Sequence, residues 1–128
     1  MRRVLLGLVG LMAATAVARA ETYSFTVLVN GMWRNQTLIH CEGPARMNGR
    51  IPERCTLSEP ATAYPNTKIP RVYDVVSAAG HPIVFFPDGL LAYCKLAHEQ
   101  AIATHGPPGY ALCSGYATFD KDGVADCD

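Results

Sequence analysis

Residues 41–55 read CEGPARMNGRIPERC, and residues 113–127 read CSGYATFDKDGVADC. The two stretches match at an offset of 72: both carry cysteine, glycine and alanine at their first, third and fifth positions and close on a cysteine. Each also has an Asx-Gly turn signal, ending at Gly49 or Gly123, between two short strand-prone runs. The shared unit is therefore a strand, a turn, a return strand and a cysteine.

A third, degenerate copy of this unit lies between the other two. Residues 85–89 and 119–123 both read Phe-x-x-Asp-Gly, at an offset of 34, and Ala79 stands where the upstream cysteine of this copy would fall. A lone two-stranded hairpin is only marginally stable in water, so such units must stack or be cross-linked. The sequence predicts a mainly β, small disulfide-stabilised domain of stacked β-hairpins, at about residues 41–57, 79–97 and 113–128.

The repeated unit also selects a disulfide pattern. Five cysteines allow fifteen choices of two bonds, but each complete unit carries one pair of cysteines fourteen residues apart. Cysteines at the feet of a hairpin can approach the Cα separation of about 5.5 Å that a disulfide needs. We therefore predict the bonds Cys41–Cys55 and Cys113–Cys127. In the competing pattern, Cys94 pairs with Cys113 or Cys127.

The predicted pairing leaves Cys94 as an unpaired thiol. Three roles are open for it: a buried, inert side chain, an intermolecular disulfide to another chain, or catalysis. If the following residues formed a helix, Cys94 and His98 would share one helix face and could meet a metal ion.

The remaining segments also favour strands. Residues 23–29 and 32–40 flank Asn30-Gly31, the strongest short-range hairpin signal. Residues 60–70 contain three prolines and predict an irregular linker. Further strands are expected at 71–77, 82–86, 90–97, 116–119 and 124–127. Residues 95–104 are ambiguous between one short helix and an edge strand at 102–104.

The first twenty residues, MRRVLLGLVGLMAATAVARA, have the parts of a secretory signal peptide. Two arginines precede an uncharged apolar run, and Ala18-Arg19-Ala20 is a small-x-small cleavage site. The apolar run is too short to span a bilayer comfortably. We expect residues 1–20 to be removed, residues 21–128 to form a single small β-rich domain, and the protein to be periplasmic or secreted, where disulfides persist.

The charge of the predicted mature chain restricts its partners. Without the three arginines of the leader, eight basic residues face eleven acidic ones, a formal charge of −3. A nucleic-acid partner would need a basic face, so none is expected. No second apolar stretch is long enough for a membrane span.

The exported strand–Asx-Gly–strand units of residues 41–57 and 79–128 resemble the bacterial β-hairpin-repeat proteins that are MORN-like. The MORN pattern places Tyr-x-Gly after the turn, and here Cys94 and Cys127 fall near that position. Members of such families mostly serve as scaffolds and binding surfaces, so the resemblance implies binding and no chemistry.

The acidic end of the chain suggests one cation. Residues 120–128 resemble the calcium loops of thrombospondin type-3 repeats, although Thr118 replaces the first acidic ligand. Carboxylates at alternating positions around a glycine turn can supply several of the oxygens that calcium requires, here from Asp120, Asp122 and Asp126. The alternative is that Asp122-Gly123 is only a turn. No cofactor is expected for this chain, and a calcium ion bound at these residues is the alternative.

Trp33, the only tryptophan, follows the first turn with Arg34 beside it. An exposed Trp-Arg pair would be a binding anchor, because these residues are enriched at interface hot spots. The alternative, with Trp33 facing the core, is the more common arrangement.

Common enzyme signatures are absent: there is no Gly-x-Ser-x-Gly, P-loop or dinucleotide-binding glycine pattern. We therefore expect a non-enzymatic binding module for an envelope or extracellular protein or polymer. A small cell-envelope hydrolase is one alternative, because paired carboxylates need not be close in sequence. A weak calcium-dependent binding module is the other.

Overall fold

The computed structural model describes residues 21–68 and 74–128, and the predicted signal peptide lies outside these ranges. Twelve strands and no helix occur within them, which confirms the mainly β class. No helix long and apolar enough to cross a membrane is present among these residues.

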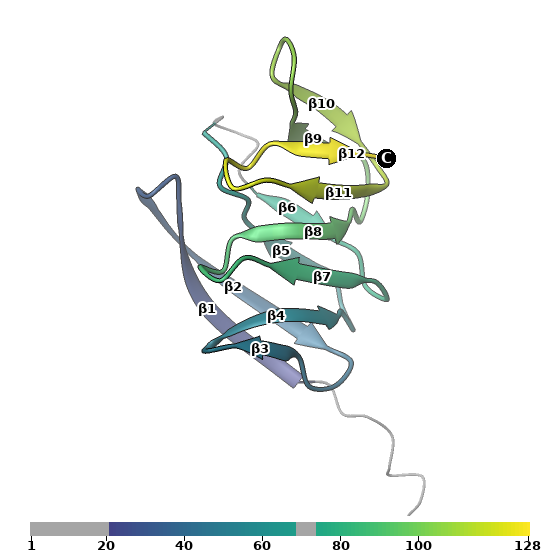
Figure 1. The fold of residues 1–128 in the computed structure, drawn as a ribbon. Helices are drawn as coiled ribbons and strands as arrows, with labels where there is room; N and C mark the ends of the chain where they lie inside the picture. Colours follow the sequence, from purple (N-terminus) through teal and green to yellow (C-terminus); the bar gives the residue numbers. More distant parts are fainter. Residues whose placement is uncertain (1–20, 69–73) are drawn as a thin grey trace, which may run out of the picture.

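Six strands form one antiparallel sheet made of three hairpins (Figure 1). Its spatial order is β12-β11-β8-β7-β4-β3. The strands are β3 (Arg46–Asn48), β4 (Ile51–Thr56), β7 (Pro82–Phe85), β8 (Leu91–Lys95), β11 (Tyr116–Phe119) and β12 (Ala125–Cys127).

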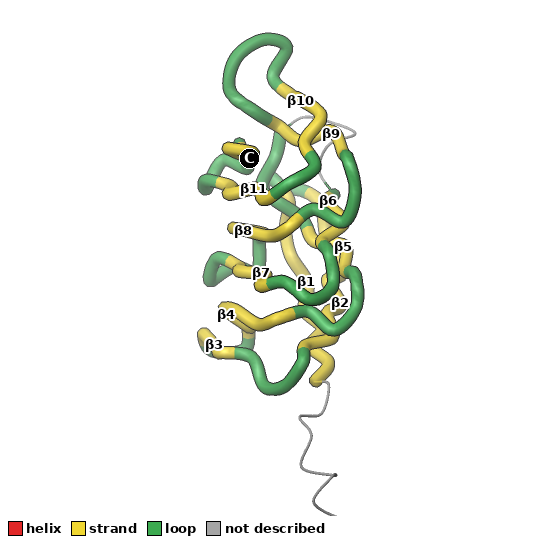
Figure 2. The backbone as a smooth tube through the Cα atoms, turned by 90° about the vertical axis from the view of Figure 1, so that its right-hand side faces the viewer, coloured by secondary structure: helices red, strands yellow, loops and turns green. Residues whose placement is uncertain are grey.

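The other six strands form a second layer of three separate two-stranded sheets behind the first (Figure 2). They are β1 (Glu21–Val29) with β2 (Trp33–Cys41), β5 (Ala61–Ala63) with β6 (Val75–Ser77), and β9 (Gln100–Ala103) with β10 (Tyr110–Cys113). The chain alternates between layers, so each pair in the second layer precedes one hairpin of the large sheet.

A side chain continues the second layer where its backbone pairing stops. The Gln100 amide accepts a hydrogen bond from the Val76 N–H (2.8 Å) and donates one to the Val76 carbonyl (2.7 Å). An amide carries the same donor and acceptor as a peptide group, so Gln100 joins β9 to β6 as a neighbouring strand would.

The hydrophobic core fills the space between the layers. Phe25 of β1 meets Phe85 of β7 edge to face, with ring centroids 5.2 Å apart. Ile39, Ile83 and Leu91 are fully buried beside them. Buried and less buried positions alternate along strands of both layers, the pattern of sheets with one solvated face.

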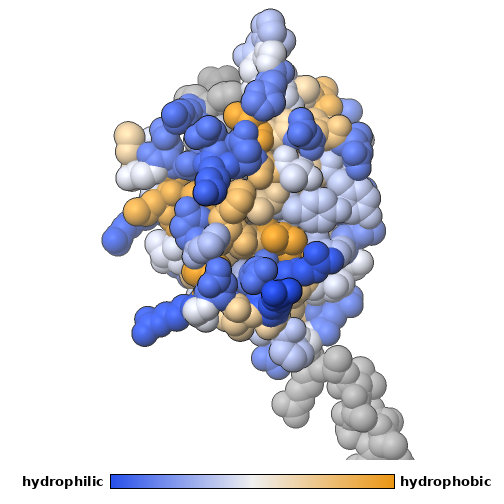
Figure 3. Space-filling model, in the orientation of Figure 1, coloured by the Kyte–Doolittle hydropathy of each residue, from blue (hydrophilic) through white to orange (hydrophobic). Residues whose placement is uncertain are grey.

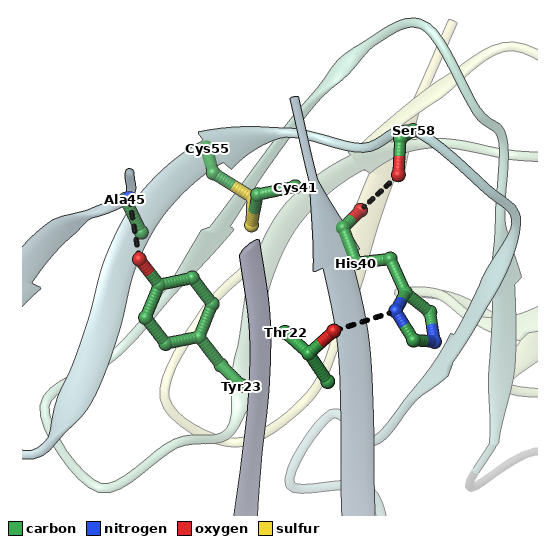
Figure 4. Close-up of a disulfide and its surroundings, with 7 residues drawn as sticks. All are labelled: Thr22, Tyr23, His40, Cys41, Ala45, Cys55 and Ser58. Atoms are coloured by element: carbon green, nitrogen blue, oxygen red, sulfur yellow. Dashed lines mark hydrogen bonds between the residues drawn. A yellow bond between two sulfur atoms is a disulfide. The ribbon is translucent and has the colours of Figure 1, made fainter. Parts of the chain in front are cut away.

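Two disulfides tie the layers together, and they are the two predicted bonds. Cys41–Cys55 joins β2 to β4 with a Cα–Cα distance of 5.9 Å, and Cys113–Cys127 joins β10 to β12 at 6.0 Å. Figure 4 shows the first bond between the two layers.

The three hairpins of the large sheet place their cysteines in one row on its inner face. The strand pairs Cys55↔Ile83, Ile83↔Cys94, Cys94↔Ala117 and Ala117↔Cys127 run from β4 to β12 without a break. Cys94 of the middle hairpin therefore corresponds to Cys55 and Cys127 of the outer hairpins.

The middle hairpin has a serine where the outer two have their first cysteine. Cys41 forms a bridge to Leu57, two residues after Cys55, and Ser77 forms the same bridge to Leu96, two residues after Cys94. Ser77 lies 36 residues after Cys41 and 36 before Cys113. The alignment that placed Ala79 at this position was wrong by two residues.

The short helix near residues 95–104 is not formed. Leu96 bridges to Ser77, and residues 100–103 are β9, so the strand alternative holds with a start two residues earlier than expected. Residues 61–63 form β5 within the segment expected to be an irregular linker. The β5 strand makes its pairs with β6, a contact that local sequence does not encode.

Candidate functional site

The tip of the β1–β2 hairpin carries the tryptophan. Asn30 and Gly31 both have positive φ, 54° and 70°, and the Met32 N–H donates to the Val29 carbonyl at 3.1 Å. The Asn-Gly turn is therefore formed as predicted. Because Val29 pairs with Trp33, Met32 is one unpaired extra residue at the tip.

Trp33 is exposed because the end of β2 overhangs the core. Along the inward face of β2, Cys41, Ile39 and Thr37 are fully buried, Asn35 is half-buried, and the Trp33 residue is 61 % exposed. Met32 beside it is 72 % exposed. Trp33 therefore does not face the core. Its exposure is consistent with the alternative in which it serves as a binding anchor.

Arg34 is also exposed, but on the other face of the hairpin. Successive residues of a strand point to opposite sides, so Arg34 shares the outward face with Leu28, its direct partner. Leu28 is half exposed as well. The tip thus presents a tryptophan on one side and an arginine with a leucine on the other.

Hydrogen bonds hold the tip in place. The Asn66 side chain accepts from the Asn30 N–H and donates to the Lys121 carbonyl at 2.9 Å, which links the tip to the β11–β12 turn. Further down the outward face of the same hairpin, Thr26 donates to Gln36 (3.1 Å), and at the end away from the tip Thr22 contacts His40 (3.0 Å). Figure 4 shows the Thr22–His40 contact.

A polar atom near Trp33 has no partner. Asn35 Nδ2 lies two residues along the same face, is buried, and makes no hydrogen bond within the residues that the structure describes. Thr37 Oγ1, further into the core, shares this condition. An unpaired buried donor costs about 1–3 kcal/mol of folding free energy, and its burial keeps the Asn35 nitrogen out of reach of an external partner.

The three aspartates do not come together as a cation site. The Asp120 carboxylate accepts hydrogen bonds from the N–H groups of Asp122 and Val124, at 2.9 and 3.0 Å, and so closes its own turn. Asp126 lies on β12, opposite Thr118. Within residues 21–68 and 74–128, no three His, Cys, Asp or Glu side chains are grouped closely enough to hold a metal.

Cys94 is fully buried with its sulfur unbonded. Burial raises the pKa of the thiol to about 11, and interaction with the Ser77 hydroxyl lowers it only in part. The burial removes the intermolecular disulfide from consideration for the folded domain, because another chain cannot reach the sulfur. His98 is exposed and not on a helix with Cys94, so the pair cannot act together as a metal or catalytic site.

The outer face of the large sheet holds a cluster that the sequence analysis missed. Tyr93 and Tyr116 have nearly parallel rings with centroids 5.8 Å apart, and Lys95 Nζ lies 5.8 Å from the Tyr116 centroid. The Tyr116 hydroxyl is 3.3 Å from His81 Nδ1. Tyr93 and Tyr116 are far apart in sequence, and the pairing of β8 with β11 brings them together.

The charges on this face divide between its two ends. The outer row that neighbours the cysteines runs Arg46, Arg54, Val84, Tyr93, Thr118, Asp126. Figure 3 views this side of the molecule, with apolar surface toward the middle and hydrophilic side chains above and below it. The row itself begins with two arginines, of which Arg46 is paired with Glu53 at 3.6 Å, and it ends with an aspartate.

Comparison with known proteins adds no relative: no family model, no curated protein and no solved structure matches the chain.

Proposed function

We propose that this protein is an exported binding module that acts in the envelope or outside the cell, with the β1–β2 tip as its anchor. The exposure of Trp33 carries the proposal. A large aromatic side chain left 61 % exposed at a hydrogen-bonded tip is typical of a residue that a partner covers.

The surroundings of Trp33 support the same function. Met32 beside it adds exposed apolar surface, and Leu28 and Arg34 add an apolar and a charged side chain on the opposite face of the hairpin, so a partner would enclose the tip from both sides. The tip is fixed to the rest of the domain through Asn66, so little ordering is needed when a partner binds. The unknown partner is an envelope or extracellular protein or polymer.

Export is supported by the leader pattern of residues 1–20 and by the two disulfides, which persist in oxidising compartments. We also propose that the three hairpins are copies of one unit. The constant 36-residue spacing of Cys41, Ser77 and Cys113 supports this, as does the MORN-like pattern of the sequence.

Co-sedimentation with purified cell-wall sacculi and outer-envelope fractions tests the proposal. Because Trp33 is the only tryptophan, its fluorescence reports directly on the tip, and a blue shift is expected when a partner covers it. The variant Trp33→Ala should lose retention, while Tyr110→Ala, an exposed aromatic on β10, should keep it. Equal retention of both variants, or turnover of a cell-wall or peptide substrate, would overturn the proposal.

A further inference from the structure

The large sheet contains the same hairpin-to-hairpin junction twice. In each junction, the second strand of one hairpin pairs with the first strand of the next: β4 with β7, and β8 with β11. The registers agree. Cys55 pairs with Ile83 and Cys94 with Ala117, while Arg54 and Tyr93, one residue earlier, pair with Val84 and Thr118.

Each edge strand of the sheet corresponds to one of the two strands of this junction, but has no partner strand on its outer side. At one edge lies β12, a second strand, and at the other lies β3, a first strand, as Figure 1 shows. By position, Asp126 corresponds to Arg54 and Tyr93, and Arg46 corresponds to Val84 and Thr118. If β3 of a second copy paired with β12 in the register of the two existing junctions, Asp126 would lie directly opposite Arg46.

We infer that copies of this chain associate head to tail, with β3 of one copy adding to β12 of the next. Opposite charges at directly paired positions favour this contact. The Arg46 guanidinium also lies 3.6 Å from the Glu53 carboxylate of its own hairpin, an exposed ion pair that Asp126 of the second copy would join or replace. The same charges disfavour like-with-like pairing, because β12 on β12 would oppose Asp126 to acidic residues and β3 on β3 would oppose arginines. Such a contact is heterologous, so it builds a ring where the rotation between copies closes and an open chain where it does not.

The β12 edge is open for this strand. A groove of about 430 Å³ lies beside it, between residues 125–128 of this edge and residues 104–105 and 111–114 of the β9–β10 segment. Ala125 is bridged to Thr104 on this side. That bridge does not prevent a strand from adding to β12. In β8, Leu91 stands at the position that matches Ala125, and its N–H donates to the Tyr64 carbonyl, yet residues 93–95 of the same strand still pair with β11.

At the β3 edge, a side chain stands in for the missing strand. The Ala45 N–H donates to the Tyr23 hydroxyl at 2.8 Å (Figure 4), and Ala45 corresponds to Ile83 and Ala117, which pair with cysteines of the neighbouring strand. Docking would exchange the Tyr23 hydroxyl for the Cys127 carbonyl of the second copy. The adjacent Pro44 is tolerable, because Pro82 occupies the matching position in the β4–β7 junction.

Sedimentation velocity of the oxidised protein over a wide concentration range tests this inference. We expect weak, concentration-dependent association that declines as salt rises from about 0.05 M to about 0.5 M, since salt screens exposed charges. The variants Asp126→Arg and Arg46→Asp should each weaken association about tenfold, because a paired opposite charge becomes a like charge. Matched charge changes away from the junction, Asp122→Arg and Arg50→Asp, should leave it unchanged.

Two further arms make the test specific. Mixing the Asp126→Arg and Arg46→Asp proteins should restore association, because each then offers its partner an opposite charge. Tyr23→Phe should strengthen association, since it removes the competing acceptor for the Ala45 N–H. Trp33→Ala should have no effect, which separates this contact from the proposed binding tip.

A cross-link can locate the contact. In an Arg46→Lys variant, carbodiimide should join the newly introduced amine on β3 of one copy to the Asp126 carboxylate of another, and mass spectrometry identifies the joined peptides. Circular dichroism and thiol counting establish that each variant is folded with both disulfides. A monomer at every concentration, also in the Tyr23→Phe variant, would overturn the inference. So would association that ignores both charge reversals, or cross-links elsewhere.

Discussion

The two faces of the six-stranded sheet come from alternate residues of the same strands, yet residue type is repeated along the inner face and changes along the outer face. The inner row holds a cysteine in every hairpin, separated by Ile83 and Ala117. The outer row, one residue away, changes from arginine through tyrosine to aspartate. The inner face therefore repeats one buried cysteine position, disulfide-bonded in the outer two hairpins and a free thiol in the middle one, while the outer face is free to carry different surface chemistry at each end.

The largest expected effect is on the inner face. Replacing Cys113 and Cys127 together by serine removes a bond that closes a loop of about fifteen residues, which should lower the free energy of unfolding by about 3 kcal/mol. Urea denaturation monitored by circular dichroism measures this difference. An unchanged midpoint would mean that packing alone holds β10 against β12.

A second change tests whether the middle hairpin is equivalent to the outer two. In Ser77→Cys, the new thiol should bond to Cys94 and raise the free energy of unfolding by about 2 kcal/mol, somewhat below the chain-entropy value because engineered bonds often fit imperfectly. Mass spectrometry without reductant should show all six cysteines oxidised. Two free thiols in the folded protein would contradict the equivalence of Ser77 with Cys41 and Cys113.

The remaining thiol of the inner row should make the protein sensitive to alkali. The Cys94 pKa is raised from 9.0 to about 11 in the folded state, so the buried thiol favours folding below pH 9, and this contribution is lost as pH rises through 11. Between pH 8 and pH 10 the loss should be about 1.4 kcal/mol. Cys94→Ala should lack this part of the decline, whereas equal pH slopes in both proteins would show that Cys94 ionises freely.

What the sequence could predict also differs between the two faces. The inner row was accessible because each disulfide joins cysteines within one short unit, and the Asx-Gly turns are local signals. The outer row was not, because Tyr93 and Tyr116 meet only through the pairing of different hairpins. The position of Ser77 was missed for a related reason. The middle unit spans three residues more between its first and last matching positions than the outer two, so the offset of 34 that aligns the turns leads from Cys113 to Ala79 instead of Ser77.

Local patterns were least informative at the margins of the domain. The exposure of Trp33 depends on where the layer beneath β2 ends, which no residue near it encodes. Residues 95–104 were ambiguous because β9 is short, and its pairing with β10 and the Gln100 contact to Val76 decide in favour of a strand. In both places tertiary packing overrides local propensity.

The smallest expected effect belongs to the outer face. The nearly parallel rings of Tyr93 and Tyr116 are a cross-strand pair on a solvated surface, and such pairs contribute about 0.5 kcal/mol beyond their separate burial. A double-mutant cycle with Tyr93→Ala and Tyr116→Ala should return a coupling free energy of this size, measured by urea denaturation. A coupling of about 2 kcal/mol or more would show that the outer face contributes to stability as the disulfide row does, and the contrast between the faces would fail. A coupling near the expected value would mean that residues of the outer row can be replaced at little cost in folding free energy. Such tolerance allows the charges of this face to change from one end of the sheet to the other.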